Sequence, residues 1–198
     1  MKKYTLIILW LFTLISGVFA GDLEDMLNQS EKLLSSNWDT MIQSLHQKGI
    51  TIFDNLVDFM PNKNIRRDEA AKMFTIASDF VGTKKEENTS ICNFSDKHLA
   101  WSDLQDLLIT SCEKGLFQWS NGKFNPTGNI TNAQAVTVAG RMLYGKQDES
   151  VGHYATKYYQ LAQENWLLKN LSISDTTKRD ATATRQTVAT LIYNALNK

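Results

Sequence analysis

The sequence has few of the residues that build metal sites. It holds two cysteines and three histidines in 198 residues, with no C-x-x-C pair, and the histidines (His46, His98 and His153) are scattered. Because a protein metal site needs ligands at close, characteristic spacings, these counts argue against a bound metal. Nothing in the sequence indicates another cofactor.

An excess of either charge is also absent. The chain has 21 basic and 21 acidic side chains and no basic cluster. Nucleic-acid binding depends on concentrated positive charge, so we expect no nucleic-acid partner. Catalytic signatures are missing too, since there is no G-x-S-x-G and no acid pair stands out from the solvated charges. We therefore expect that the chain is not an enzyme.

Long apolar runs are missing except at the N-terminus. There Lys2-Lys3 precede an apolar run over residues 6–15, and small residues lead up to Ala20 and Gly21. This order is typical of a secretory signal, here predicted to be cleaved between Ala20 and Gly21. The alternative is an uncleaved anchor, although the run is shorter than the roughly 20 residues that a membrane span needs. We expect an exported protein without a stable membrane span after cleavage.

Both cysteines lie in the exported part. Removal of residues 1–20 takes away two lysines and no acids, which leaves 178 residues with 19 basic and 21 acidic side chains. In an oxidising compartment Cys92 and Cys112 are expected to form a disulfide. Closing a loop of this length stabilises a fold by about 3 kcal/mol. The alternative is a pair of free, buried thiols.

One pattern occurs three times in the exported part, and its middle copy is the clearest. Apolar residues three, four and seven apart predict a helix from Ala100 to Gly115; they are Trp101, Leu104, Leu107, Leu108 and Cys112. Gly115 is typical of the position just past a helix end. After a turn-rich loop, Thr131 and Gln134 form a capping box. They predict a second helix that runs to about Tyr144.

The flanking copies keep this order of helix, loop and helix. The first has a glycine stop at Gly49 and a second helix that opens at Ile65. In the third, Asn165-Trp-Leu167 replaces the glycine stop, and the second helix opens at Ala183. Residues 21–36 are expected to form a short lead-in segment. The predicted fold is therefore all-α, with copies at residues 37–82, 91–145 and 153–198.

The ordered motifs of the middle copy closely resemble the S-layer homology (SLH) domain family. They are Phe94-Ser-Asp96, Ala100-Trp101, Lys114-Gly-Leu116, Asn121-Gly-Lys-Phe-Asn-Pro126 and Ile130-Thr131 with Ala133. Ile65-Arg-Arg-Asp-Glu69 and Ala183-Thr-Arg185 resemble the same family's helix opening, Ile-Thr-Arg-Ala-Glu. The resemblance covers residues 37–198. It implies three helix–loop–helix repeats about a pseudo-threefold axis, with grooves between neighbours.

The resemblance also implies a function. Such repeats attach without catalysis to an anionic cell-wall polysaccharide or a peptidoglycan-associated polymer, at the cell surface, cell wall or periplasm of a bacterium. The family's groove ligands include the arginine of the helix opening, which corresponds to Arg67 and Arg185. An arginine in the first helical turn combines a bidentate donor with the positive end of the helix dipole.

Three further residues are candidate ligands. Arg66 stands beside Arg67 and could assist it. Asn132 occupies the arginine place in the middle copy, so it keeps hydrogen bonding without charge. Trp119, in a polar loop, could stack on a sugar ring.

Structural roles compete with these assignments. Arg67 and Arg185 could pair with an acid on a neighbouring copy, and Trp38 and Trp101 are expected in the core because they lie on apolar stripes. Asp96 and Asp175 are expected to brace loops. The alternative function is a structural or adaptor protein of the envelope, which acts through contacts with another envelope protein or through self-assembly.

Overall fold

A computed structural model describes residues 37–82, 92–118, 121–150 and 152–198. The regular structure in these ranges is helical, as the sequence predicts, and strand-like pairing is limited to isolated bridges. The chain divides into two compact units, residues 1–41 and 42–198. The predicted signal, its cleavage site between Ala20 and Gly21, the lead-in segment and Trp119 all lie outside the described residues.

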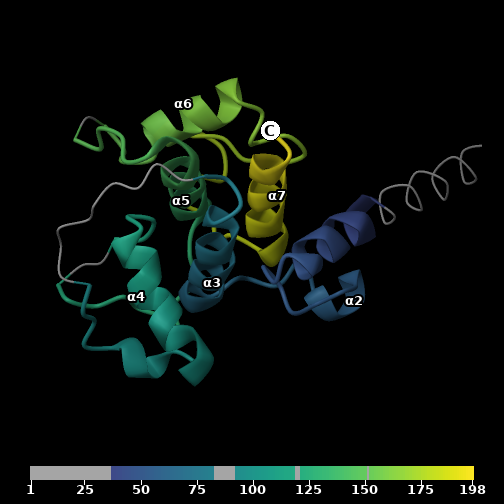
Figure 1. The fold of residues 1–198 in the computed structure, drawn as a ribbon. Coiled ribbons are helices and arrows are strands. Elements are labelled where there is room, and N and C mark those ends of the chain that lie inside the picture. The colour runs from purple at the N-terminus through teal and green to yellow at the C-terminus, as the bar shows by residue number, and fades with distance from the viewer. Residues whose placement is uncertain (1–36, 83–91, 119–120, 151) are drawn as a thin grey trace, which may run out of the picture. The chain divides into compact units, whose positions relative to one another are not determined.

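Three helices contact one another in the larger unit: α3 (Arg67–Ser78), α5 (Asn132–Tyr144) and α7 (Arg185–Leu196). Two shorter helices pack on them. The helix α4 (Gln105–Glu113) lies against α3, and α6 (Thr156–Glu164) lies against α5 (Figure 1). Residues 37–47 are also helical. The remaining elements are short: α2 (Leu56–Phe59), η1 (Lys97–Leu99) and η2 (Ser102–Leu104).

Backbone hydrogen bonds join the segments that enter the three long helices. The amide of Ile65 donates to the carbonyl of Ala183, Ala183 donates to Ile130, and Ile130 donates back to Ile65, at 3.1, 2.8 and 3.3 Å. All three residues are fully buried. Each entering segment therefore bonds to both of the others, and this closed ring fixes where α3, α5 and α7 begin.

The helices at 37–47, α4 and α6 end in the same backbone conformation. Gly49, Gly115 and Trp166 have φ of 70°, 68° and 63°. The residue after each of them is fully buried and donates its amide back to the helix; these residues are Ile50, Leu116 and Leu167. The predicted glycine stops are confirmed, and Trp166 adopts the glycine-like conformation in the third place.

The packing of α6 on α5 depends on a close approach. A Cβ at Gly140 would lie 2.5 Å from Cδ1 of Tyr158, which is fully buried. The Tyr158 hydroxyl donates to Glu149 Oε1 at 2.7 Å and accepts from the amide of Gln147 at 3.0 Å. Because Gly140 has no side chain, the ring can lie directly on the helix.

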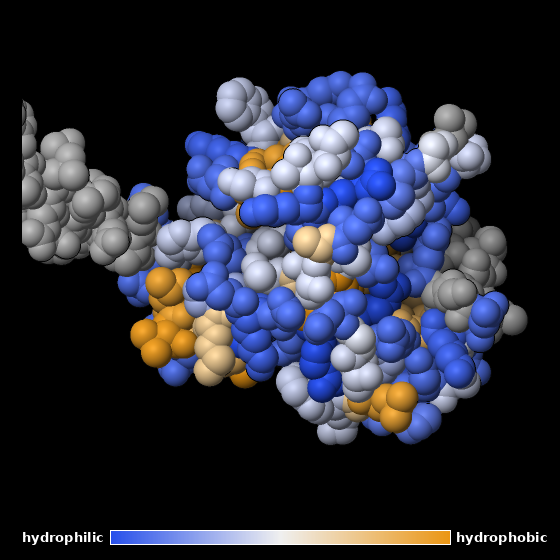
Figure 2. Space-filling model, turned by 180° about the vertical axis from the view of Figure 1, so that it is seen from behind, coloured by the Kyte–Doolittle hydropathy of each residue, from blue (hydrophilic) through white to orange (hydrophobic). Residues whose placement is uncertain are grey.

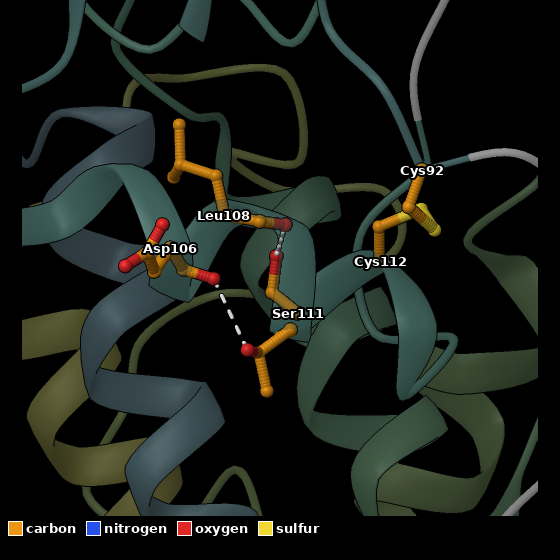
Figure 3. The surroundings of a disulfide bond; sticks show 6 residues. Cys92, Asp106, Leu108, Ser111 and Cys112 are labelled. Carbon is orange, nitrogen blue, oxygen red and sulfur yellow. Dashed lines mark hydrogen bonds between the residues drawn. A yellow bond between two sulfur atoms is a disulfide. The ribbon is translucent and has the colours of Figure 1, made fainter.

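A disulfide joins Cys92 to Cys112, the pair that the sequence predicts, with Cα atoms 5.8 Å apart. It ties the chain that precedes η1 to α4 (Figure 3). In the same loop, the carboxylate of Asp96 accepts from the amides of Phe124 and Asn125, at 2.9 and 2.8 Å. The prediction that Asp96 braces the loop is therefore confirmed.

The start of the predicted helix in the middle copy is wrong. The α-helix begins at Gln105, five residues after Ala100, and the residues ahead of it form two 3-10 turns. Trp101 has an extended backbone (φ −58°, ψ 144°), so its ring leaves the apolar stripe. It is 51% exposed and not part of the core, and the Arg66 guanidinium lies 4.6 Å from the centre of its ring.

Candidate ligand-binding grooves

The first turns of α3, α5 and α7 place the candidate ligands at matched positions. Arg67, Asn132 and Arg185 are each the first helical residue. Their amides donate to the carbonyls of Gly128, Ala181 and Lys63, and the next amides donate to Pro126, Arg179 and Pro61, at 2.7–3.1 Å.

The helix starts therefore do not offer these amides to an anion. The third amide of α5 is also capped, because it donates to the Thr131 hydroxyl at 3.2 Å, as the capping box predicts. The corresponding amide in α7 donates to Thr184 at 3.2 Å. Because these backbone amides already have partners, any anion site at the helix starts must come from side chains.

Arg185 lies in an ion pair. Its Nη2 donates to Glu69 Oε1 at 2.7 Å, its Nη1 donates to the carbonyl of Phe59 at 3.0 Å, and its guanidinium lies 5.1 Å from the ring centre of Phe53. The side chains of Arg185 and Glu69 are 8% and 12% exposed. For Arg185, the structure thus shows the alternative given above, in which the arginine pairs with an acid. The charge is neutralised within the protein, in a largely apolar pocket that Trp101 also lines.

Arg67 is placed differently. Its guanidinium lies over the adjacent rings of Phe117 and Phe124, 5.0 and 4.9 Å from their centres, and its Nη2 donates to the carbonyl of Gln118 at 2.6 Å. Its Nε is buried and has no hydrogen-bond partner. Burial, followed by the charge of Arg141, lowers the pKa of Arg67 to about 10. Cation–π contacts with two rings stabilise the charge without neutralising it.

A pocket of about 270 Å³ opens at Arg67. Six of the side chains that line it carry hydrogen-bond donors: Arg67, Gln118, Gln134, Thr137, Arg141 and Tyr154. The Thr137 hydroxyl is buried and has no partner. Gln134 Oε1 accepts from the Thr131 amide at 3.1 Å, so its amide group remains as a donor.

Arg141 and Glu149 are pocket residues that the sequence did not single out. Arg141 donates to Glu149 Oε1 through Nε and Nη2, at 3.1 and 2.5 Å, and to the carbonyl of Leu116 at 3.1 Å. Tyr154 completes the wall, and burial raises the pKa of its hydroxyl. Arg141 lies late in a helix and pairs with a residue in the following loop, so no local motif marks it.

Asn132 and Arg66 are engaged within the protein. The Asn132 amide donates to the carbonyl of Lys178 at 2.8 Å, and the residue is 4% exposed. Arg66 makes a bidentate pair with the buried Asp68, at 3.0 and 2.6 Å, and lies over Trp101. Arg66 is the chain neighbour of Arg67, but it does not line the Arg67 pocket. That either residue binds a ligand stays a prediction.

Comparison with known proteins adds no relative. No protein-family model, no curated protein and no solved structure matches the chain. Within the described ranges, no group of His, Cys, Asp or Glu side chains could hold a metal ion. None of the helices in this part of the chain has the length and apolar character of a membrane span.

Proposed function

We propose that the chain is a non-catalytic cell-envelope protein of a bacterium, built from three SLH-like repeats about a pseudo-threefold axis, which binds an anionic cell-wall polysaccharide or a peptidoglycan-associated polymer. The closed ring of hydrogen bonds through Ile65, Ala183 and Ile130 supports the arrangement, because each entering segment uses the same atoms toward its neighbour. The matched helix ends at Gly49, Gly115 and Trp166 support the repeats.

The observation that carries the binding proposal is the difference between two matched arginines. Arg185 is neutralised by Glu69, whereas Arg67 faces a pocket that is rich in donors. Arg67 and Arg141 bring two positive charges to this pocket against the single negative charge of Glu149. A carboxylate on a sugar is an acceptor that such donors bind strongly. The Arg67 pocket is therefore the proposed anion site.

Sedimentation with purified bacterial cell walls tests this proposal. Replacing Arg67 by glutamine removes the charge but keeps a polar side chain, and should weaken retention about tenfold or more, since hydrogen bonds to charged groups contribute roughly 1.5–3 kcal/mol. Lys123→Gln is the matched control, because it makes the same charge change at an exposed position of the neighbouring loop. Equal retention of R67Q, K123Q and the unaltered protein would reject the proposal.

Exposed apolar side chains support a second candidate, an envelope adaptor. Most of the face in Figure 2 is hydrophilic, and apolar residues gather in a few places. In and around α2, Ile52, Val57 and Met60 are 68%, 83% and 54% exposed. Isolated apolar residues are normal on a surface, but a group of them favours a protein contact. Wall binding that survives R67Q and is lost in Val57→Asp would favour this function.

A further inference from the structure

A second pocket lies at the C-terminal ends of α6 and α7, far in sequence from Arg67. Its volume is about 460 Å³, and both aromatic and amide side chains line it. The aromatic residues are Trp166 and Tyr193, and the amides include Asn165, Asn194 and Asn197. An aromatic face next to several amides suits a ligand that has both an apolar surface and hydroxyl groups.

Trp166 is placed where a large side chain is unfavourable. Its φ of 63° is one that glycine adopts freely, and the two matched helix ends have glycine there. The ring is 75% exposed, so burial does not compensate for the strained backbone. A large aromatic residue in this conformation presents its ring to solvent beside the pocket. Strained residues of this kind cluster at functional sites.

Asn194, a residue of α7, holds the segment that follows Trp166 against this helix. Its Nδ2 donates to the carbonyls of Leu167 and Lys169, at 2.8 and 2.9 Å. Because both amide hydrogens are used, Asn194 presents its Oδ1 as an acceptor. Asn165 likewise donates from Nδ2 to the carbonyl of Leu161 at 2.9 Å. Asn165 and Asn194 line the same pocket as Trp166, so their side-chain oxygens can serve it as acceptors.

The charged side chains of the pocket are partly engaged elsewhere. Lys198 Nζ donates to the Tyr144 hydroxyl at 2.8 Å and lies 4.5 Å from the centre of that ring. Glu164 Oε1 accepts from Gln160 Nε2 at 2.9 Å. With Lys169, two lysines and one glutamate line the pocket. Because Lys198 and Glu164 already have partners, the aromatic and amide side chains are the main groups that can recognise a ligand here.

We propose that this pocket binds a pyranose unit of a polysaccharide. The C–H face of the sugar ring would lie on the Trp166 indole, and its hydroxyl groups would donate to the oxygens of Asn194 and Asn165. A pyranose fits because one side of it is apolar and its edge carries donors and acceptors. The inference does not depend on anion binding at Arg67, because the two pockets share no residue.

Titration of the ¹⁵N-labelled protein with cellotriose, maltotriose and triacetylchitotriose, followed by NMR, tests the inference. At least one trisaccharide should shift the indole N–H signal of Trp166 and the backbone signals of residues 165–170 and 193–197. The shifts should saturate with a Kd on the order of 1 mM, as expected for one ring on one aromatic face.

Trp166→Gly is the decisive variant, because glycine suits the φ of this position and the fold should persist. It should weaken binding about tenfold or more, while Trp101→Phe, at another exposed tryptophan, should leave binding unchanged. Trp166→Asn, which also tolerates this φ, is a second variant should the glycine variant unfold. The inference is overturned if none of the three sugars shifts the Trp166 signal, or if the folded Trp166 variant binds like the unaltered protein.

Discussion

Exchanging each of the two matched arginines for methionine should have unequal consequences for stability. Arg67 and Arg185 occupy the same helical position, and methionine keeps the apolar part of either side chain. Only Arg185 is bonded to an acid, Glu69. The pair of variants therefore separates an arginine that stabilises the fold from one that the fold does not need.

The magnitudes follow from the contacts. Without Arg185, Glu69 stays largely buried and unpaired and the Phe59 carbonyl loses its donor, so we expect a loss of about 3 kcal/mol. For Arg67, the lowered pKa shows whether its charge stabilises or destabilises the folded state. At pH 7, below the folded pKa of about 10 and the higher unfolded pKa, the guanidinium is charged in both states, and its burial disfavours the folded one.

The pKa difference of Arg67 corresponds to about 3 kcal/mol as an upper limit, which solvent contact reduces to roughly 1–2 kcal/mol. The methionine variant also loses the hydrogen bond to Gln118 and the two ring contacts. This loss offsets a similar amount of free energy, so the two effects nearly cancel. The free energy of unfolding of Arg67→Met should therefore stay within about 1 kcal/mol of the unaltered protein.

Urea unfolding at pH 7, monitored by tryptophan fluorescence, measures the free energy of unfolding of both variants. The reasoning predicts that Arg185→Met is the less stable variant by about 3 kcal/mol, with equal slopes for the two variants. Equal losses would refute it, because Arg67 would then be a structural residue and its pocket would need no ligand to explain it. A matching wall-binding defect in Arg67→Met would complete the separation of stability from binding.

Three further changes test the framework. Cys112→Ser should lower the free energy of unfolding by about 3 kcal/mol, because the disulfide spans 20 residues, and reduction of the unaltered protein should lower its Tm in the same way. Asp96→Asn removes the charged carboxylate that accepts hydrogen bonds from two backbone amides, one of them that of Phe124. It should lower the free energy of unfolding by about 2–3 kcal/mol in urea, and a loss below about 1 kcal/mol would show that the loop does not need this charge. Gly140→Ala places a Cβ against Tyr158 and should cost about 1–3 kcal/mol by thermal unfolding, so an unchanged Tm would contradict the close packing.

Local patterns predicted the parts of the fold that depend on neighbouring residues. The capping box of Thr131 and Gln134 begins α5 as expected, and Gly49 and Gly115 end their helices in the left-handed conformation. These features need only a few adjacent residues to form. The start of α4 was misplaced because Trp101 fits the apolar spacing, while its ring is held outside by Arg66 from another segment.

The environment of the candidate ligands could not be predicted in this way. The ion pair of Arg185 reaches Glu69, which is 116 residues away, and nothing near either residue marks the other. The Arg141–Glu149 pair joins a helix to an ordinary polar loop. The sequence therefore named the position of each arginine but not which of them is neutralised.

The backbone ring explains how one helical position can serve different purposes. At each helix start the first two amides are satisfied by carbonyls of another segment, so the ring does not depend on the side chain of the first residue. That side chain is an ion-paired arginine in α7, an arginine that faces a pocket in α3, and a buried asparagine in α5. A substitution there changes the charge of one groove while the hydrogen bonds that orient all three helices remain. If the three segments are repeats, they could therefore diverge in binding without losing their common frame. Arg67, which has no ion pair among the described residues, is where we propose that a charged ligand acts.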